Sequence, residues 1–466
     1  MESLERRVER ASSLVERKFS NSDKSLLQAI AMKTSHDLIL LLVALSATSN
    51  AIASNWPSWR GGVEGSGVSS EKNLPVEWSD SRNVRWKVPL PERGNSTPVV
   101  WGNRIFITQA IESEGRRTVM CLDRANGRSL WQSGTTWKEK EETHETNPYC
   151  SASPATDGER VVVAFGSAGV YCYDFDGKEL WHRDLGRQHH EWGYASSPVL
   201  QGDLCFIYHG PGPGAHLLAL DKKTGKTVWK FDEPPPKTEG RGDGFKGKEP
   251  GYVGTWSTPI LIKAGGRDEL VMSFPNRVVA FDPKTGKQLW TCDGLNPLLY
   301  TSPIYGEGLV VAMGGFFGSS IAVKPGGNGD VTGTQRVWRE ERAKKNRCGS
   351  GVVADGRIYF VNMEGFIECI DLKTGQQLWE ERLPRQGSKG ESWSNTLLVG
   401  DRIYAVNQSG DVVVFKAGPK FEMVAVNSIG NEMTNASLVP SNGEFLLRTH
   451  KHLWCLGESK AAASAR

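Results

Sequence analysis

Short runs of alternating apolar and polar residues recur along the chain, and each pair of runs flanks a glycine turn. Four copies of this phrase are STPVVWGNRIFI, SSPVLQGDLCFIY, TSPIYGEGLVVAM and WSNTLLVGDRIYAV. Alternation with a period of two residues around a Gly turn predicts an antiparallel β-hairpin. A third alternating strand follows each hairpin, so the hydrophobic pattern predicts an all-β protein built from repeated units.

A turn that contains Asp and Gly, followed by a strand with Trp, completes most units. The phrase recurs as DRANGRSLW, DFDGKELW, DKKTGKTVW, DPKTGKQLW and DLKTGQQLW. The Asp carboxylate can accept hydrogen bonds from turn N–H groups, and the Gly supplies the positive φ angle that closes the turn. We expect the indole to pack against the neighbouring unit. The turn aspartates are Asp123, Asp174, Asp221, Asp282 and Asp371.

Four-stranded antiparallel units with a period of about 40–60 residues predict a β-propeller. An aromatic residue marks the outer strand of each of eight units, which predicts eight blades. These residues are Trp86, Trp131, Trp181, Trp229, Trp290, Trp338, Trp379 and Phe421. A seven-bladed ring is the competing interpretation, because the Phe421 unit has no Asp–Gly turn.

The two ends of the repeat region complement each other. Residues 83–90, NVRWKVPL, form a Trp strand with no hairpin before it, whereas residues 435–457 provide three strands with no Trp strand after them. We therefore expect the N-terminal strand to complete the C-terminal blade. Such closure protects edge strands that would otherwise pair with other chains.

The cysteines follow the same register. Cys121, Cys172 and Cys369 occupy the position that Ala219 and Ala280 occupy in other units. This register predicts small buried side chains, and we expect buried free thiols rather than disulfides.

Composition excludes some classes of protein. The chain has 466 residues, of which 38% are hydrophobic and 23% charged, so it can bury a sizeable core. The net charge is only +3 and no stripe of Lys and Arg is present, which argues against a nucleic-acid-binding protein.

The first 53 residues differ in character from the repeat region. Lys33 precedes a short apolar run at residues 38–45, and Ala51-Ile52-Ala53 has the form of a cleavage site. This pattern predicts a secretory signal peptide, since the run is shorter than the roughly 20 residues of a membrane span. A membrane anchor is the alternative, and a start at Met32 would make residues 1–31 a spurious upstream extension.

The remaining chain divides into three parts by pattern. We expect a lead-in at residues 54–75, the propeller at 76–457 and a disordered tail at 458–466. The expected location is periplasmic or secreted, and after cleavage we expect no integral membrane segment.

The pattern A-x-D-x-x-T-G-x-x-x-W in ALDKKTGKTVW and AFDPKTGKQLW resembles the pyrroloquinoline quinone (PQQ)-like β-propeller repeat family, over roughly residues 76–457. That family includes quinoprotein alcohol dehydrogenases and the non-enzymatic propeller lipoprotein of the outer-membrane assembly machine. EWGYASSPVL and RTHKHLWCLG are similar to phrases of secreted PQQ-like propellers from planctomycete-type bacteria. The resemblance implies the fold, and it does not distinguish a dehydrogenase from a binding protein.

The dehydrogenases of this family imply what a quinone site would need. They carry a disulfide between adjacent cysteines over the cofactor, and they hold Ca²⁺ with carboxylate and amide groups at the ring centre. None of the eight cysteines here is adjacent to another, and the sequence has no C-x-x-C-H haem segment. We therefore predict no cofactor, and PQQ with calcium remains the alternative.

Two groups of residues are candidates for a site at one mouth of the ring. His189, His190 and Glu191 lie in a connection between blades, although neighbours on a strand point to opposite faces and zinc needs three or four converging ligands. Aromatic residues lie at or just before the first strand of their blades, where the ring would bring them together. These are Trp192, Tyr194, Trp256, Tyr300 and Trp393. They could stack on sugars or peptide side chains, or instead pack between blades or plug the channel.

These observations predict an exported, non-catalytic propeller that binds or scaffolds an envelope protein or a glycan. We assign no catalytic residues and no metal ligands. A PQQ-dependent oxidoreductase with an atypical site is the alternative function. A metal-dependent hydrolase or lyase that uses His189, His190 and Glu191 is the third.

Overall fold

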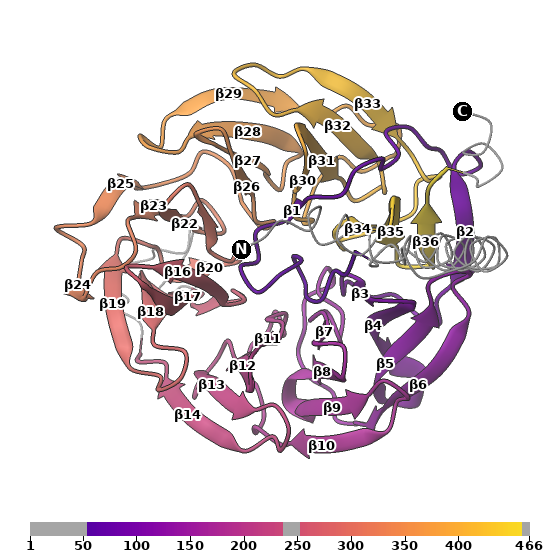
Figure 1. The fold of residues 1–466 in the computed structure, drawn as a ribbon, viewed down its shortest axis with the longest axis horizontal. Helices are drawn as coiled ribbons and strands as arrows, with labels where there is room; N and C mark the ends of the chain where they lie inside the picture. The colour runs from indigo at the N-terminus through magenta and orange to yellow at the C-terminus, as the bar shows by residue number, and fades with distance from the viewer. Residues whose placement is uncertain (1–53, 236–251, 459–466) are drawn as a thin grey trace, which may run out of the picture. The chain divides into compact units, whose positions relative to one another are not determined.

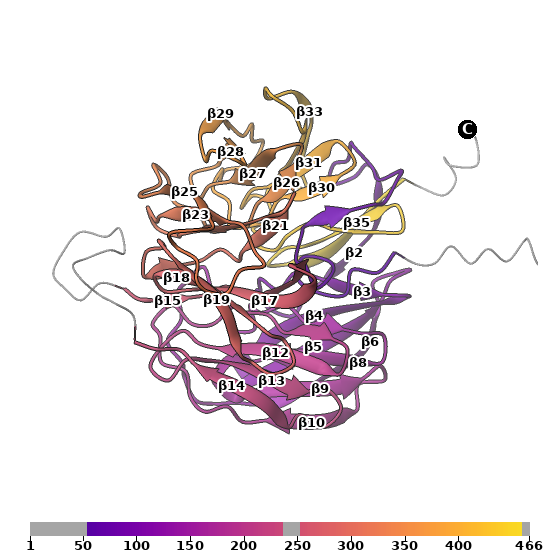
Figure 2. The same cartoon turned by 60° about the vertical axis from the view of Figure 1, so that its left-hand side comes forward.

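Eight antiparallel blades arranged in a ring make up the part of the chain that the computed structural model describes, residues 54–235 and 252–458 (Figure 1). The blades are arranged around a central axis, and Figure 2 shows the outer strands β10 and β14 at the rim. The predicted all-β class and the eight-bladed ring are confirmed, and the seven-bladed alternative is wrong. The predicted signal peptide lies outside the described residues, as does the predicted tail from residue 459 on.

Each blade contributes one strand to each of four concentric layers. The inner layer contains β3 (Val99–Trp101), β7 (Ala155–Thr156), β11 (Val199–Gln201), β16 (Ile260–Ala264), β21 (Ile304–Gly306), β26 (Val352–Ala354), β30 (Leu397–Val399) and β34 (Val439–Ser441). The second layer contains β4 (Arg104–Ile111), β8 (Arg160–Ala164), β12 (Leu204–His209), β17 (Arg267–Phe274), β22 (Leu309–Met313), β27 (Arg357–Val361), β31 (Arg402–Val406) and β35 (Glu444–Arg448). The third layer contains β5 (Arg116–Asp123), β9 (Val170–Asp174), β13 (His216–Asp221), β18 (Arg277–Phe281), β23 (Ser320–Val323), β28 (Phe366–Asp371), β32 (Val412–Lys416) and β36 (His452–Leu456). The outer layer contains β6 (Ser129–Thr136), β10 (Glu179–Arg183), β14 (Thr227–Asp232), β19 (Gln288–Asp293), β25 (Arg336–Glu340), β29 (Gln377–Arg382), β33 (Met423–Asn427) and β2 (Val84–Pro89).

A few short elements lie outside these layers. They are β1 (Val68–Ser69), β15 (Gly254–Thr255), β20 (Leu298–Leu299), β24 (Gly329–Asp330) and the 3₁₀ turns η1 (Glu112–Glu114) and η2 (Gly166–Ala168). Among the described residues, no helix has the length and apolar character that a membrane span requires.

The ring closes where β2 pairs with β36. Trp86 lies opposite Cys455 in this antiparallel pair, so the first strand of the propeller completes its last blade. This confirms the closure that the sequence predicts. The two ends of the repeat region are thereby joined through one sheet rather than left as exposed edges.

The repeated Trp and Gly residues form the joints between neighbouring blades. In six blades the indole N–H of the outer-strand Trp donates a hydrogen bond to a backbone carbonyl of the next blade, as Trp181 does to Lys222 at 2.9 Å. The other five Trp–carbonyl pairs are Trp86–Arg124, Trp131–Phe175, Trp229–Pro283, Trp338–Leu372 and Trp379–Gly418. The expected packing of each indole on a neighbouring unit is therefore confirmed for these six.

The turn glycine lies directly against that indole. Gly286 has a φ angle of +71°, and a Cβ atom at this position would lie 2.6 Å from Trp229. The same contact joins Gly127 to Trp86, Gly177 to Trp131, Gly225 to Trp181 and Gly375 to Trp338. The glycine is thus required twice, by its backbone conformation and by the close approach of the indole.

The turn aspartate fixes the backbone around the glycine. Asp282 Oδ1 accepts hydrogen bonds from the N–H groups of Lys284 at 2.9 Å and Thr285 at 2.8 Å. Asp221 and Asp371 accept the equivalent pairs of hydrogen bonds from their own turns. This confirms the role that the sequence predicts for these carboxylates.

A small residue lies opposite each repeated Trp, next to a β-bulge. Cys121 pairs with Trp131, Cys172 with Trp181 and Cys369 with Trp379, and the register shifts directly after each cysteine. All eight cysteines are free, and seven of them are buried. Burial raises the pKa of Cys121 and Cys172 to about 12, as expected for structural thiols.

Two blades depart from the repeat. The assignment of Phe421 to an outer strand is wrong, because β33 begins after it and Ala425 lies in the Trp position opposite Val414. Phe421 instead packs on Trp379 with ring centroids 5.9 Å apart. In the other exception, Trp290 is fully buried and its indole N–H donates to Glu269 Oε2 at 2.7 Å.

The lead-in, residues 54–75, runs along the inner strands of several blades (Figure 1). Trp56 and Val100 exchange two backbone hydrogen bonds of 2.9 Å, and the carbonyl of Val63 accepts one from Leu261 N–H at 2.9 Å. β1 then pairs in parallel with β30, the inner strand of the seventh blade. The lead-in therefore ties blades together that are distant in the sequence.

Arg60 anchors the lead-in within the ring. The guanidinium is buried, at 2% exposure, and it donates to four backbone carbonyls, two of them on Ser350 at 2.7 Å and Gly351 at 2.5 Å. No carboxylate forms an ion pair with it among the described residues. This burial without a counter-charge lowers the pKa of Arg60 to about 9.

Candidate functional site

A closed ring of hydrogen bonds links all eight blades around the channel. In each blade the residue just before the inner strand donates its backbone N–H to the side-chain oxygen of the equivalent residue in the next blade. Distances run from 2.7 to 3.1 Å, and the bond from Ser437 N–H to Thr97 Oγ1 closes the circle. We call these eight residues the hydroxyl ring: Thr97, Ser153, Ser197, Thr258, Ser302, Ser350, Asn395 and Ser437.

The hydroxyl ring has a sequence signal that is easily overlooked. In five blades the residue of the hydroxyl ring directly precedes a proline, within the phrases STP, ASP, SSP, STP and TSP. A proline next to a strand usually indicates a turn or an edge strand. The residue before the proline is therefore easily taken as part of that turn signal. Only the ring closure shows that the eight positions face one another.

The hydroxyls of this ring use only part of their hydrogen-bonding capacity. Each of the seven Ser and Thr oxygens accepts a hydrogen bond from the neighbouring blade. No described group accepts a hydrogen bond from any of these seven hydroxyls. Because a hydroxyl can donate one bond as well as accept, seven O–H donors remain available around the axis.

A cavity of about 400 Å³, which we call the mouth cavity, lies above this ring. Six members of the hydroxyl ring line it: Thr97, Ser153, Ser197, Thr258, Asn395 and Ser437. Amides and aromatic rings complete the lining, and they include Asn95, Asn147, Asn435, Trp59, Trp192, Trp256, Tyr300, Phe316 and Trp393. The size falls within the range of roughly 300–1,000 Å³ that is usual for small-molecule sites.

Three of the aromatic residues form one cluster on the wall of the cavity. The ring centroids of Trp192, Trp256 and Tyr300 lie 5.6 to 6.1 Å apart. Trp256 is nearly buried, and its indole N–H donates to the carbonyl of Gly193 at 2.9 Å. The ring contacts connect aromatic side chains of different blades, and this hydrogen bond joins one of these side chains to the backbone of another blade.

Half of the eight predicted site residues line the mouth cavity. Trp192, Trp256, Tyr300 and Trp393 do so, whereas Tyr194 and His190 line a separate cavity of about 30 Å³. Burial raises the pKa of Tyr194 well above its ordinary value, so its hydroxyl stays protonated. The sequence therefore locates part of the aromatic wall, and it misses Trp59 and Phe316.

His189, His190 and Glu191 do not form a common site. His189 and Glu191 are exposed, while His190 packs edge-on against Trp256 at 4.8 Å and accepts a hydrogen bond from Trp192 N–H at 3.1 Å. Burial lowers the pKa of His190, which keeps the ring neutral. Across residues 54–235 and 252–458, no three His, Cys, Asp or Glu side chains are grouped as metal ligands. The hydrolase alternative thus has no converging ligand set in this region.

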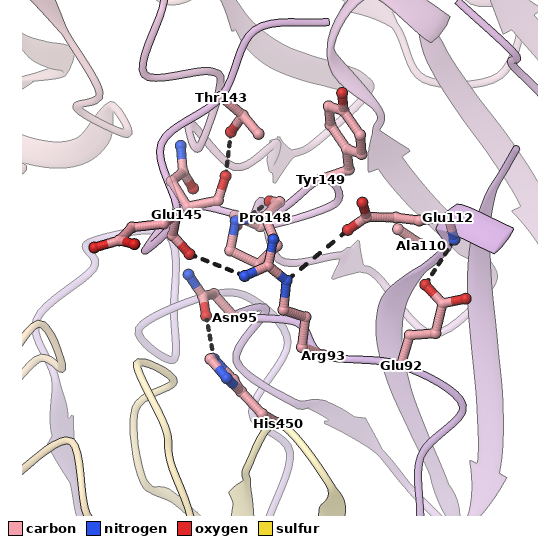
Figure 3. A network of polar contacts seen from close by, with 12 residues as sticks. Glu92, Arg93, Asn95, Ala110, Glu112, Thr143, Glu145, Pro148, Tyr149 and His450 are labelled. Carbon is pink, nitrogen blue, oxygen red and sulfur yellow. Dashed lines mark hydrogen bonds and ion pairs between the residues drawn. The ribbon is translucent and has the colours of Figure 1, made fainter. Parts of the chain in front are cut away.

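A polar network holds the loop that carries His144, Glu145 and Thr146, and this loop lies at one side of the mouth cavity (Figure 3). Asn95 Nδ2 donates to the carbonyl of Thr146 at 2.7 Å, and Arg93 donates to the carbonyl of Glu145 at 3.1 Å. His450, from the last blade, lies 3.2 Å from Asn95 Oδ1. Burial, followed by nearby positive charges, lowers the pKa of His450 to about 4. His144 on this loop lines the mouth cavity with Thr146.

The mouth cavity lacks acidic side chains and the strong bases Lys and Arg in its described lining. Its one thiol, Cys348, has its pKa raised to about 12 by burial. The cavity therefore combines aromatic surface with neutral hydroxyl and amide groups and with the imidazole of His144.

The ring, its Trp–Gly joints and its axial cavity together define an eight-bladed β-propeller. The family model described as "Outer membrane protein assembly factor BamB" matches residues 115–291 and 255–437. The chain therefore belongs to the PQQ-like β-propeller repeat family.

Three similar proteins illustrate the range of this fold. The outer membrane protein assembly factor BamB of Burkholderia pseudomallei (strain K96243) is 24% identical over 272 residues, which cover 52% of this chain and 68% of the relative. The crystal structure of BamB from Moraxella catarrhalis superposes with a TM-score of 0.55 at 13% identity, and covers 80% of this chain and 96% of its own. The quinohemoprotein alcohol dehydrogenase ADHIIG of Pseudomonas putida HK5 gives a TM-score of 0.60 at 15% identity, and covers 87% and 81%. At these identities the structural likeness shows the fold alone.

The residues of the mouth cavity do not fit PQQ. This quinone carries several carboxylates, which require cationic side chains or a bound cation for charge balance when they are buried. The described lining offers no Lys or Arg, and it offers no carboxylate to hold Ca²⁺. The cysteines of the described chain include no disulfide. We derive no redox step for this site.

Proposed function

We propose that this protein is a binding propeller of the cell envelope that receives a group of a protein or glycan partner in its mouth cavity. The observation that carries the proposal is the composition of this cavity, with aromatic rings and hydrogen-bond donors around one axis and no Asp, Glu, Lys or Arg in its described lining. Such a lining supports recognition by stacking and hydrogen bonding.

An exported location belongs to the same proposal. It rests on the signal-peptide pattern of residues 1–53 and on the similarity to outer membrane protein assembly factors. A binding role for a rigid ring is consistent with that similarity.

Photo-crosslinking tests the proposal directly. A photoreactive amino acid replaces Trp393, which lines the mouth cavity, or Leu378, which is 47% exposed on the rim strand β29 and serves as the matched control. After irradiation with the envelope fraction, we expect a defined cross-linked product from position 393 and none from position 378. The same products from both positions, or none from either, would overturn the proposal.

The oxidoreductase alternative has its own test. Purified protein is incubated with PQQ and Ca²⁺, and the bound quinone is measured by absorbance after gel filtration. We expect no stoichiometric uptake and no dye reduction with alcohols or sugars. Stoichiometric uptake with dye reduction would replace the binding proposal with a catalytic function.

A further inference from the structure

From the geometry of the mouth cavity we infer that the group it receives is a neutral sugar ring of a glycan. This inference rests on the proposed function, because it names the chemistry of the ligand that the cavity binds. It depends on three properties of the cavity: the uncommitted donors of the hydroxyl ring, the aromatic surfaces above them and the absence of Asp, Glu, Lys and Arg from the described lining.

The donors of the hydroxyl ring require a ligand rich in acceptors. Thr97, Ser153, Ser197, Thr258 and Ser437 line the cavity, and no described group accepts a hydrogen bond from their hydroxyls. Each hydroxyl oxygen already accepts at least one bond from a neighbouring blade, and its O–H remains available as a donor. An apolar ligand would leave these donors unpaired away from water, which is unfavourable for each of them.

The arrangement of the donors favours a compact ring over an extended chain. The five hydroxyls belong to different blades, so they approach the axis of the propeller from different directions. A sugar ring carries hydroxyl oxygens around its whole edge, and it can therefore meet donors that approach it from five consecutive blades. A peptide segment presents its acceptors along a line, so it satisfies fewer of these donors at once.

The aromatic surfaces suit the faces of such a ring. Trp393 and Trp59 line the cavity and are only partly buried, and within the described chain neither makes a ring contact with another aromatic side chain. The C–H faces of a sugar are apolar and can pack on an indole. Trp192 and Tyr300 extend this surface through the aromatic cluster.

The absence of Asp, Glu, Lys and Arg from the described lining argues against ionic ligands. An acidic sugar, a phosphate or a basic peptide side chain would be desolvated in a cavity whose described lining has no counter-charge. A neutral polyol avoids this penalty, because each of its hydroxyls can exchange water for a protein hydroxyl or amide. Asn95, Asn147 and Asn435 supply both donors and acceptors for this exchange.

Calorimetric titration of the purified protein with defined oligosaccharides tests the inference. The probes are neutral hexasaccharides of glucose, mannose, galactose or N-acetylglucosamine, and a hexamer of galacturonate is the charged control. We expect at least one neutral probe to bind and the charged probe not to bind. Trp393→Ala should weaken binding about 10-fold or more. Leu378→Ala should bind as the wild type does, and the melting temperature of each variant shows that it is folded.

The outcomes separate this inference from the proposed function. If no neutral probe binds but a protein cross-links at position 393, the sugar inference is overturned and the binding function stands. If neither occurs, both are overturned. Binding of a neutral probe that Trp393→Ala leaves unchanged would place the sugar elsewhere and would also overturn the inference.

Discussion

The outer joints and the inner joints of this propeller connect the same blades by different means. At the rim, an indole packs on the glycine of the next turn and donates its single N–H to a backbone carbonyl. At the channel, a hydroxyl oxygen accepts a hydrogen bond from a backbone N–H of the neighbouring blade, and its own O–H group can still donate one. The rim joint uses the only hydrogen-bond donor of the indole, whereas the channel joint leaves the O–H donor of the hydroxyl available.

This difference shows how a repeat can provide both stability and recognition. The six Trp–carbonyl joints leave no polar group of the indole available for a ligand. The hydroxyl ring holds the blades in register and faces the mouth cavity with its remaining donors. A substitution at the rim should therefore affect stability alone, while a substitution at the channel should affect binding as well.

The largest expected effect is the loss of a rim indole. Trp229 is 8% exposed, and Trp229→Ala should lower the free energy of unfolding by about 3–5 kcal/mol. The partly exposed Trp393 packs in no such joint, and its replacement by Ala should cost only about 1 kcal/mol. Denaturant titration measures both values, with the exposed Val228→Ala as the control for the strand. Equal losses for the two tryptophans would contradict the distinction between rim and channel.

A methyl group at the turn glycine should have the next largest effect. Gly286→Ala introduces a Cβ atom 2.6 Å from the Trp229 indole at a φ angle of +71°. The combined overpacking and backbone strain should cost about 2 kcal/mol or more. Gly202→Ala is the matched control, because its φ angle is also positive at +57° but nothing lies within 4 Å of the added atom. The comparison isolates the indole contact, which would be unimportant if both variants lost the same stability.

Acid should destabilise the mouth network more than the rim joints. The pKa of His450 is about 4 in the folded protein, against an ordinary value of 6.5, because burial and the charges of Arg448, Arg93 and Lys389 oppose protonation. The unfolded chain therefore takes up the proton first, and stability is lost as the pH falls from about 6.5 to about 4. His450→Gln should reduce this loss by about 1–2 kcal/mol.

The control for this pH dependence is a rim variant. Trp229→Ala removes no titratable group, so its stability loss should stay constant between pH 7 and pH 4. Another buried histidine, His209, also has a pKa of about 4, but it is present in all of these proteins and cancels in the difference. Parallel pH profiles of wild type and His450→Gln would show that His450 does not carry the effect.

The smallest expected effect on stability is the loss of one channel hydroxyl. Ser197→Ala removes the acceptor of Ser153 N–H, a bond of 3.0 Å, and should cost about 1 kcal/mol. It also removes a donor from the mouth cavity, so it should weaken sugar binding in the same calorimetric assay. A stability loss with unchanged affinity would assign the hydroxyl ring a structural role only.

Much of the fold could be predicted from the sequence, and the site could be predicted only in part. The number of blades and the closure of the ring could be predicted from local signals, because each Asp–Gly turn and each Trp strand is specified by a few consecutive residues. Phe421 shows the limit of this approach, because the absence of the turn in that blade removes the local register that locates the outer strand. Four of the eight candidate residues line the mouth cavity, and His189 and Glu191 do not, because the orientation of adjacent side chains depends on how the connection packs.

Local sequence signals specify the repeated unit: alternating strands, the turn that needs Asp and Gly, and the indole that needs a neighbour. Only the closed ring determines which residues of the eight units contact one another around the axis, because local sequence signals do not reach from one blade to the next. The hydroxyl ring joins residues up to 340 positions apart, and Arg60 of the lead-in reaches carbonyls 290 and 291 positions away. Recurring Ser–Pro and Thr–Pro phrases mark five of the ring positions, but they do not show that these positions contact one another. That contact depends on the closure of the ring and not on the spacing of residues along any strand.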